Sequence, residues 1–419
     1  MFFGFFRTNV SLFYDFHVGL STALLVYKSF RKFSLFPPSL FVQNNYIFYT
    51  FFRKFAIFGL ISFVFFHIIG KVYIKVLQKE VFHMATIKDI ANRLGISIST
   101  VSKGLNGASD ISDDLRQLVL DTAVEMGYST KRSKKVEYRK LCLFITNMEY
   151  KTLDTFGYDI VLGFKQNAFK HKWDVTVVEI DVAFQEQNKY DTYLLQHGYC
   201  GAFILGLALH NPWFEQMKTT TMPTVLFDNF IDGNQNVGYL GTDSREGIHM
   251  AVEHLVNLGH KKIAFLNGSP GSLVSDERQE AFESAVREFK IDCNDKMMAK
   301  GYFVADSAHY HVPAFLEEGA TAIVCGNDLL AQGAIETCVK AGYRVPEDIS
   351  IIGFDNIPIA ATTEPPLTTI SQQRNELGRC AYTTLRSLIN HVSISKTMLR
   401  PQLVERESTT VVSRTAKKK

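Results

Sequence analysis

The spacing of apolar side chains changes along the chain. Between residues 86 and 126 they recur every three or four positions, which is the spacing of one face of a helix. From residue 141 onward, runs of four to six mostly apolar residues alternate with longer stretches of helical spacing. The first region therefore predicts a small all-helical unit, and the second predicts strand–helix–strand units with parallel sheets.

Two short helices joined by a tight turn are predicted between residues 86 and 106. Thr86 can cap the first helix, and Asp89 three residues later completes a pair that resembles a capping box. Gly95 supplies the turn, and Ser97 is a natural cap for the second helix. The apolar face of the first helix consists of Ile87, Ile90, Ala91 and Leu94.

The second helix of this pair has an apolar face and a polar face. Val101 and Leu105 can pack inward. The outward positions are Ser99, Ser102, Lys103 and Asn106. A helix-turn-helix unit places its second helix in the DNA major groove, with the N-terminal residues against base edges. The segment by itself also fits an ordinary helical hairpin.

A third amphipathic helix is predicted over Asp113–Met126, ending at Gly127. It is followed by KRSKKVEYRK, residues 131–140, which contains six basic residues and one acid. Such a charge run is commonly a solvated linker. Beside a helix that reads a groove, it is also well placed to contact phosphates, and the pattern supports both roles.

The remainder of the chain predicts repeated strand–helix–strand units. The candidate strands are Leu141–Ile145, Val175–Ile180, Ala202–Leu205, Thr224–Phe227, Lys262–Leu266, Ala322–Cys325 and Ser350–Phe354. Helical stretches include Gly157–Lys170, Arg245–Leu258, Asp276–Phe289 and Asp328–Ala341. Parallel sheets bind ligands at the carboxyl ends of their strands. About 270 residues are enough for two such lobes around a central cleft.

The first 83 residues differ in composition from the rest. They hold 19 of the 34 phenylalanines, nine basic residues and two acids, without a clean helical or alternating pattern. The best membrane candidate, Phe55–Gly70, has 16 residues and includes His67, so it is slightly shorter than the roughly 20 that span a bilayer. Two interpretations remain, a membrane anchor or a start set too far upstream. We favour the second, because Met84 directly precedes the capped helix.

Charge, cysteines and motifs exclude several functional classes. The 419 residues carry a net charge of only +3, so a surface that binds nucleic acid must be local. The six cysteines are scattered, which fits a reducing cytoplasm and mostly buried thiols, and argues against disulfides and zinc. Without GxSxG, P-loop or HExxH motifs, we expect no enzyme, cofactor or metal. His260 is expected in an exposed turn, and Asp328 as a helix cap.

Four motifs follow one another along the chain. They are MATIKDIANRLGISISTVSKGLNG from residue 84, EHLVNLGHKKIAFLNG at 253–268, GNDLLAQGAIETCVKAGYRVPEDISIIGFDN at 326–356 and PPLTTISQQRNELGRCA at 365–381. Together they resemble the LacI/GalR family of transcriptional regulators, over nearly four fifths of the chain. The resemblance implies an α/β protein, in which a small all-α helix-turn-helix headpiece precedes a two-lobed, periplasmic-binding-protein-like effector domain with parallel sheets. Residues 1–83 have no counterpart in the family.

The resemblance assigns roles in DNA binding to residues of the headpiece. The base-reading positions fall on Ile98, Ser99 and Lys103. A lysine can donate to guanine O6 and N7, a serine can bond several base edges, and an isoleucine can touch a thymine methyl. Positions that bond phosphates, and so fix the register without reading sequence, match Thr86, Ser97, Ser102 and Asn106. For each serine, a helix cap or a solvated surface is the alternative.

One segment departs from the family pattern. Family members usually carry Pro-Asn or Pro-Ser and then Ala-Arg-x-Leu before the core, and this short hinge helix pushes its leucine into the minor groove. Here Tyr128–Lys131 and further basic residues follow, a few positions shorter and without that leucine. No apolar wedge can be assigned. We expect the basic run to contact phosphates instead, which would make binding more salt-sensitive and less sequence-selective.

The resemblance also places effector-binding positions in the two-lobed domain. They are Asp228, Arg278, Phe303, Asn327 and Asp355. A planar guanidinium at Arg278 suits paired hydroxyls or a carboxylate. Asp355 and Asn327 follow predicted strands, where turn formation or capping is the alternative role. Phe303 matches an aromatic position that stacks on a sugar or base ring.

The resemblance implies a sequence-specific DNA-binding regulator, a repressor switched by a small-molecule effector, with a sugar or sugar derivative favoured. A cytoplasmic homodimer that reads an inverted repeat in a double-stranded DNA operator is expected. The alternative is a membrane-tethered or solute-binding receptor with a vestigial headpiece. The expected divisions are the extension 1–83, the headpiece 84–130, the basic linker 131–140, the effector-binding and dimerisation domain 141–411, and the basic tail 412–419.

Overall fold

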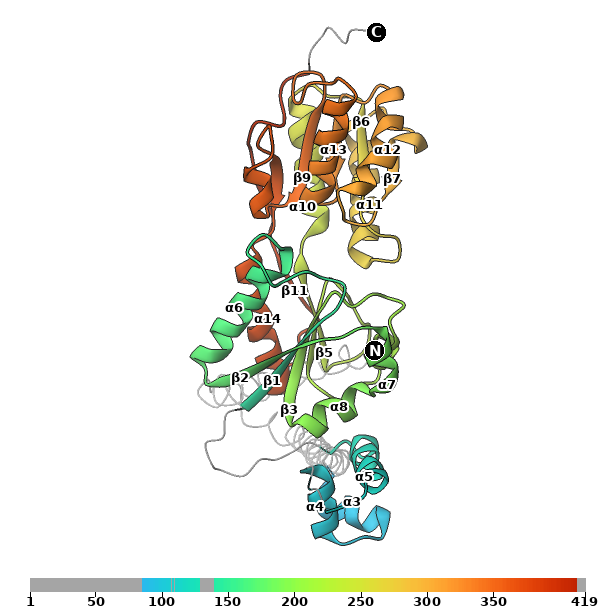
Figure 1. Cartoon of the computed structure of the whole chain (residues 1–419), viewed down its shortest axis with the longest axis vertical. Coiled ribbons are helices and arrows are strands. Elements are labelled where there is room, and N and C mark those ends of the chain that lie inside the picture. The colour runs from blue at the N-terminus through green and yellow to red at the C-terminus, as the bar shows by residue number, and fades with distance from the viewer. Residues whose placement is uncertain (1–84, 107, 109, 129–138, 413–419) are drawn as a thin grey trace, which may run out of the picture. The chain divides into compact units, whose positions relative to one another are not determined.

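The computed structural model describes residues 85–106, 108, 110–128 and 139–412. The extension 1–83 with its membrane candidate Phe55–Gly70, most of the basic linker and nearly all of the basic tail lie outside the described residues. No helix in the described part of the chain is long and apolar enough to cross a membrane. The described residues form a helical headpiece and two lobes that each contain a sheet (Figure 1).

The headpiece consists of α3 (Ile87–Leu94), α4 (Ile98–Leu105) and α5 (Asp113–Glu125). Thr86 and Asp89 form the predicted capping box on α3, and the Ser97 hydroxyl caps α4. Gly95 ends α3 at φ 67°, a left-handed conformation that costs glycine no steric penalty. The helices share a small apolar core of Ile90, Ala91, Val101, Val119 and Ala123. The predicted helix-turn-helix unit is confirmed.

The N-lobe comprises residues 139–242 and 374–399. Its parallel sheet has the strand order β11-β5-β4-β3-β1-β2. The strands are β1 (Arg139–Ile145), β2 (Trp173–Glu179), β3 (Tyr199–Leu205), β4 (Thr224–Phe227), β5 (Val237–Thr242) and β11 (Lys396–Leu399). The helices are α6 (Phe156–Lys170), α7 (Val182–Gln187), α8 (Tyr190–His197), α9 (Pro212–Gln216) and α14 (Arg374–Ile389). Helices α6 and α14 lie side by side on one face of this sheet (Figure 1).

The C-lobe comprises residues 244–371 and 402–412. Its sheet has the order β12-β10-β9-β8-β6-β7, and only β12 runs antiparallel to its described neighbour. The strands are β6 (Ile263–Asn267), β7 (Met298–Lys300), β8 (Ala322–Cys325), β9 (Ser350–Asp355), β10 (Thr368–Ser371) and β12 (Gln402–Val404). The helices are α10 (Ser244–Asn257), α11 (Leu273–Phe289), α12 (Asp306–Glu317) and α13 (Asp328–Lys340), with short 3-10 turns η2 (Asp295–Met297) and η3 (Pro358–Ala361).

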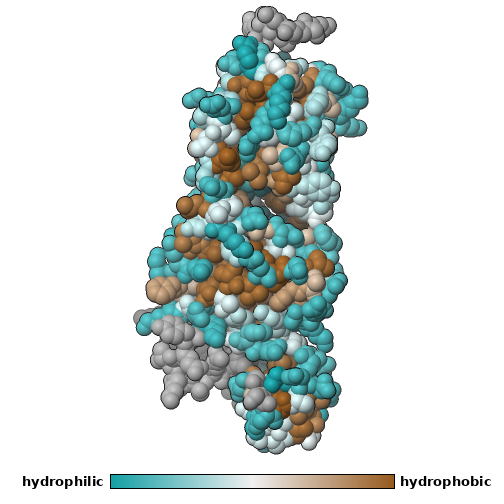
Figure 2. Space-filling view, viewed as in Figure 1, coloured by the Kyte–Doolittle hydropathy of each residue, from teal (hydrophilic) through white to brown (hydrophobic). Residues whose placement is uncertain are grey.

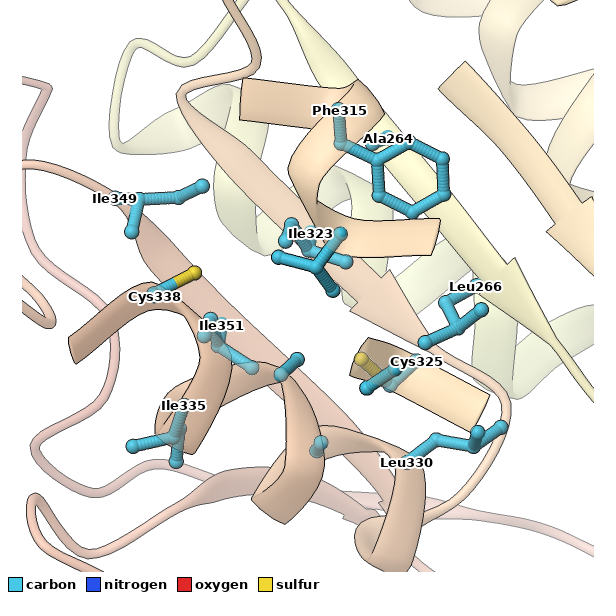
Figure 3. Close-up of a cluster of buried hydrophobic side chains, with 14 of the residues drawn as sticks. Ala264, Leu266, Phe315, Ile323, Cys325, Leu330, Ile335, Cys338, Ile349 and Ile351 are labelled. Atoms are coloured by element: carbon cyan, nitrogen blue, oxygen red, sulfur yellow. The ribbon is translucent and has the colours of Figure 1, made fainter. Parts of the chain in front are cut away.

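Helices cover both faces of each sheet, so the central strands are apolar along their whole length. Figure 3 shows one cluster of the C-lobe, in which side chains of β8 and β9 meet those of α13. Cys325 and Cys338 both lie in this core as free thiols, as expected from their scattered spacing. Burial raises the pKa of the Cys338 thiol to about 12, so it stays protonated and unreactive.

The chain passes between the lobes three times, at residue 243, at residues 372–373 and at residues 400–401. Strands β5 and β10 each end at such a passage, so their carboxyl ends lie at the lobe junction. Because their neighbours run parallel to them, the carboxyl ends of both sheets border the junction. This edge is where parallel sheets bind ligands, as the sequence predicts.

All seven strands predicted from sequence are present, within three residues at each end. The predictions Thr224–Phe227 and Ala322–Cys325 have the observed bounds. Strand β1 begins at Arg139, so the last two residues of the predicted basic linker belong to the N-lobe sheet. Five further strands, β5, β7, β10, β11 and β12, did not stand out in the pattern.

Two predictions about single residues were wrong. His260 is buried, and its ring nitrogens lie 3.0 Å from the Thr321 hydroxyl and from the Thr410 carbonyl, so it ties the chain terminus to the C-lobe. Asp328 is the first residue of α13, and the helix is capped by Asn327 instead, whose side chain accepts from the Leu330 backbone. The buried Asp328 carboxylate accepts hydrogen bonds from the Ile357 backbone, at 2.8 Å, and from a threonine hydroxyl of β10.

Candidate DNA-reading helix and effector site

The polar face of α4 is exposed, whereas its other face is held by the headpiece core. The side chain of Ile98 is 53% exposed and that of Lys103 48%, and Ser99 is also exposed. Val101 and Gly104 on the opposite face are buried, and a Cβ at Gly104 would press on Val119 of α5. The three base-reading candidates therefore lie on a free surface whose backbone is fixed from behind.

The ammonium group of Lys103 forms an ion pair with Asp110, in the loop between α4 and α5. This contact lowers the pKa of the Asp110 carboxyl, chiefly through the hydrogen bond from Lys103. Asp110 was missed from the sequence, because a carboxylate in a polar loop carries no signal by itself. Its position makes it a direct competitor of DNA for the Lys103 ammonium.

The four phosphate-contact candidates all make local hydrogen bonds. Thr86 and Ser97 cap helices, and the Ser97 hydroxyl also lies 2.7 Å from that of Ser99. The side-chain amide of Asn106 donates to the Ser102 carbonyl at 2.8 Å. Of the two serines, Ser97 thus has the capping role that the sequence left as the alternative. Each hydroxyl and amide still has hydrogen-bonding capacity for a phosphate oxygen.

The structure brings Asp228, Arg278 and Asp355 into one electrostatic group at the lobe junction. Asp228 follows β4 of the N-lobe, Asp355 ends β9 of the C-lobe, and the charge of Arg278 acts on both carboxyls. Arg278 is 3% exposed and lies on α11. Its guanidinium donates to the Gly326 carbonyl and stacks 3.8 Å from the centre of the Phe354 ring. The arginine is thus oriented before any ligand binds.

Both carboxyls of this group titrate close to neutral pH. Burial raises the pKa of Asp228 to about 7, and the charge of Arg278 opposes the rise. Burial likewise raises the pKa of Asp355 to about 6, against the charge of Arg278 and a 2.7 Å hydrogen bond from the Gln372 amide. Perturbed carboxyls at the edge of a parallel sheet are typical of a ligand site.

Asn327 and Phe303 lie next to each other, and their contact is structural. The Asn327 amide caps α13 through the Leu330 backbone and donates to the Phe303 carbonyl at 3.0 Å. The Phe303 ring covers Gly268, where any Cβ would clash with it. One hydrogen and one lone pair of the amide remain for a ligand. Capping, the alternative role for Asn327, is therefore present alongside the predicted one.

Backbone strain gathers at this junction. Asp228, Phe303, Asp355 and Asn356 all have positive φ, at 54°, 59°, 114° and 55°. Residues other than glycine rarely adopt such values, and when they do, they concentrate at ligand sites and switches. Three of the five predicted effector residues are in this set.

The sequence missed several polar groups at the same junction. The hydroxyls of Thr242 and Ser275 and the carbonyl oxygen of the Gln372 side chain are buried without a hydrogen-bond partner among the described residues. Thr242 ends β5, and Gln372 follows β10. A polar residue directly after an apolar strand is the signal that could have identified both. Buried polar atoms without partners are costly unless something else satisfies them, and a bound ligand would do so.

Arg374, also missed, connects the two lobes. It opens α14 of the N-lobe and is largely buried. Its guanidinium pairs with Asp159 at 3.0 Å and donates to the Thr155 carbonyl at 3.3 Å, both in the N-lobe. It also reaches the Asn356 carbonyl of the C-lobe at 3.5 Å. Its contacts therefore depend on the angle between the lobes.

Two family models match the chain. A model of bacterial regulatory proteins of the lacI family matches residues 86–131, which are the headpiece. A model of a periplasmic binding protein-like domain matches residues 252–409, which cover most of the C-lobe and the end of the N-lobe. The first match covers the headpiece, and the second starts within α10 and includes α14 and β11 of the N-lobe.

This chain matches relatives with similar sequences over nearly the whole length of those relatives. The HTH-type transcriptional repressor PurR of Actinobacillus pleuropneumoniae serotype 3 (strain JL03) is 30% identical over 328 residues, which are 77% of this chain and 95% of that protein. PurR of Haemophilus influenzae (strain PittEE) is 29% identical over 337 residues, 78% of this chain and 98% of that protein.

Solved structures give the same result for the fold. The lac repressor dimer bound to operator and the anti-inducer ONPF is 25% identical, with a TM-score of 0.56 over 78% of this chain and 99% of that chain. The transcriptional regulator CelR in complex with cellobiose is 23% identical, with a TM-score of 0.58 over 77% of this chain and 99% of that chain. The second similarity concerns the fold alone.

Proposed function

This chain belongs to the lacI family of bacterial regulatory proteins, and from that premise we propose how its parts act. It is a DNA-binding transcriptional repressor controlled by a small-molecule effector. We propose that α4 enters the major groove, with Ile98, Ser99 and Lys103 against base edges. The phosphate contacts are assigned to Thr86, Ser97, Ser102 and Asn106. The observation that carries this proposal is the exposed polar face of α4 on a capped, internally packed helix pair.

The repressor acts in the cytoplasm as a homodimer. Its operator is an inverted repeat. Exposed aromatic residues support self-association, because Tyr302 is 70%, Tyr310 81% and Phe169 80% exposed. Figure 2 shows that hydrophobic side chains reach the visible surface in both lobes. Large exposed apolar side chains commonly mark an interface. The named relatives are repressors, and we propose no catalytic activity for this chain.

The effector is a sugar or a sugar derivative, held by Asp228, Arg278, Phe303, Asn327 and Asp355. Sugar hydroxyls can donate to the two carboxylates and accept from the guanidinium. An effector that prefers one lobe arrangement changes the affinity for the operator. The operator then changes the affinity for the effector by the same factor, because both bind one protein.

The DNA-binding assignment is tested by selecting an operator from random duplexes and measuring affinity by fluorescence anisotropy. Lys103→Ala should cost about 1–3 kcal/mol and relax the base preference at one position. Lys88→Ala, on the exposed side of α3, is the matched control. If Lys103→Ala left both affinity and base preference intact, the role of Lys103 would be wrong.

The effector assignment is tested by a thermal-shift screen of sugars and nucleosides. A ligand present at a hundred times its Kd should stabilise the protein by about 2.7 kcal/mol. Asp355→Asn, which keeps the shape of the side chain, should abolish the shift for the best sugar. A shift that persists in this variant would place the ligand elsewhere.

A further inference from the structure

Cationic side chains gather where the strands of the N-lobe sheet begin. We call this set the amino-edge surface, and it consists of Arg139, Lys140, Lys170, Lys172 and Arg386. Arg139 and Lys140 open β1, opposite Trp173 and Asp174 of β2. The end of α6, the turn into β2 and the last turn of α14 supply the other three cations. All five side chains are exposed.

Ring contacts show that these elements meet at one place. The Arg139 guanidinium lies 5.3 Å from the centre of the Trp173 ring. The His171 ring stacks on Tyr382 of α14 with 5.2 Å between ring centres. Burial raises the pKa of Tyr382, and the charges of Arg386 and Arg139 both oppose the rise, so both arginines lie near this hydroxyl.

Asp174, opposite Lys140 on β2, offsets only part of the positive charge of the amino-edge surface. None of its five cations has an ion-pair partner within the described ranges 85–128 and 139–412, apart from their gaps. Cations also stabilise the partial negative charge of helix carboxyl ends, and this accounts for Lys170 and Arg386. It does not account for Arg139, Lys140 and Lys172, which lie on a strand and in a turn.

The chain itself keeps this surface near the DNA. The headpiece is described up to Tyr128, and the N-lobe begins at Arg139, so eleven peptide steps span at most roughly 40 Å. In the sequence, four more basic residues lie at 131–135, three residues before β1. The hinge leucine of the family is missing from this stretch. The edge where the linker enters is therefore the part of the lobes tethered closest to the headpiece.

We propose that the amino-edge surface binds the phosphate backbone of the DNA beside the site that the headpiece reads. The proposal rests on the proposed function, since it concerns the same operator complex. Exposed lysines and arginines bond phosphate oxygens without reading sequence, and each contact releases counterions. The lobes thereby add affinity and salt sensitivity, while α4 supplies the base preference.

The test compares two double variants of the full chain on the selected operator between 50 and 200 mM salt. Lys172→Ala with Arg386→Ala removes two cations of the amino-edge surface. Lys261→Ala with Lys340→Ala removes two exposed cations from the C-lobe and is the control. The first variant should reduce the slope of log affinity against log salt by about 1.8 per subunit, with base preference unchanged. The control should keep the wild-type slope.

Thermal unfolding separates this role from helix stabilisation. Equal melting temperatures of the two double variants, together with the reduced slope in one, support the proposal. An unchanged slope in the first variant, or the same reduction in the control, would overturn the proposal. An unchanged slope is expected if the surface binds another copy of the chain or an acidic protein instead of DNA. If the wild-type chain bound no duplex at all, the proposed function itself would fail instead.

Discussion

At the scale of single residues, the charged groups of this protein are arranged before their ligands arrive. Lys103 is paired with Asp110 on the exposed side of the headpiece. Arg278 is held by a backbone carbonyl and an aromatic ring, and its charge acts on two carboxyls. The ion pair limits what the Lys103 ammonium can bind. The contacts of Arg278 fix the direction in which its guanidinium donates. Both can be tested by removing one carboxylate.

Asp110→Asn should strengthen binding to DNA of arbitrary sequence. Without its carboxylate partner, Lys103 is free to contact a phosphate, which steepens the salt dependence by about 0.9 and raises affinity roughly 3-fold at low salt. Stability should change little, because ion pairs between exposed side chains contribute little to folding. Salt-dependent anisotropy with a random duplex measures the effect. Asp114→Asn, an exposed acid in the first turn of α5, removes the same charge and is the control; equal effects would contradict the competition.

Asp228→Asn should stabilise the ligand-free protein in a pH-dependent way. The raised pKa of Asp228, about 7, means that the folded state binds its proton more tightly than the unfolded state, so wild-type stability falls as pH rises from about 4 to 7. Asparagine avoids this loss. We expect a gain of about 3–4 kcal/mol above pH 7, seen as a rise in Tm, that vanishes towards pH 4. A gain independent of pH would contradict the shifted pKa.

At the scale of elements, α6 and α14 approach each other through glycines. A Cβ at Gly163 would clash with the Asn375 carbonyl, and one at Gly378 with the Ile160 carbonyl. The two helices can therefore pack backbone against backbone on the N-lobe sheet, although they are more than two hundred residues apart in sequence. This close packing positions Arg374, the first residue of α14, against Asp159.

Gly378→Ala should destabilise the N-lobe. In an ordinary helix, the change from glycine to alanine is stabilising by about 0.5–1 kcal/mol. Here the added carbon forces the helices apart, and we expect a net cost of about 1–3 kcal/mol in thermal or urea unfolding. Thr383→Ala, on the exposed side of α14, reports the effect of helix propensity alone. Stabilisation by Gly378→Ala would show that the helices are not in contact there.

The sequence predicted elements where local pattern and packing agree. Strand Thr224–Phe227 is a short apolar run with clear limits, and it has the observed bounds. Strand β5 was missed because VGYLGT contains two glycines, and α12 because Pro313 interrupts its helical pattern. Arg374 was missed as a site residue, because its partner Thr155 lies 219 positions earlier. Contacts of this range exist only once the fold has formed.

At the scale of the whole molecule, two lobes share three chain passages and one arginine that reaches across the junction. Arg374 bonds Thr155 and Asp159 in one lobe and the Asn356 carbonyl in the other. Asn356 directly follows Asp355, the acid that ends β9 in the effector group. A change in the lobe angle on ligand binding would therefore alter the hydrogen bonds of Arg374. Arg374 thereby couples the effector group to the lobe angle in a chain that lacks the hinge leucine of the family.

Arg374→Met should weaken the effect of the effector on operator affinity. Methionine fills much of the space but makes none of the three bonds, so the lobe angles are less restricted. We expect the ratio of affinities with and without effector to fall at least about 5-fold, near the lower end of typical coupling energies. Anisotropy with saturating effector measures this ratio. Arg379→Met removes an exposed arginine paired with Glu376 on the same helix, and it should keep the wild-type ratio.

The return of the chain to the N-lobe has a consequence for its synthesis. Helix α14 and strand β11 belong to that lobe but follow the C-lobe in sequence. A ribosome that has translated up to residue 371 has therefore released a first sheet that lacks both its edge strand beside β5 and one of its covering helices. The nascent N-lobe therefore exposes an apolar surface to solvent until translation is nearly complete. A chaperone could bind this surface at that stage.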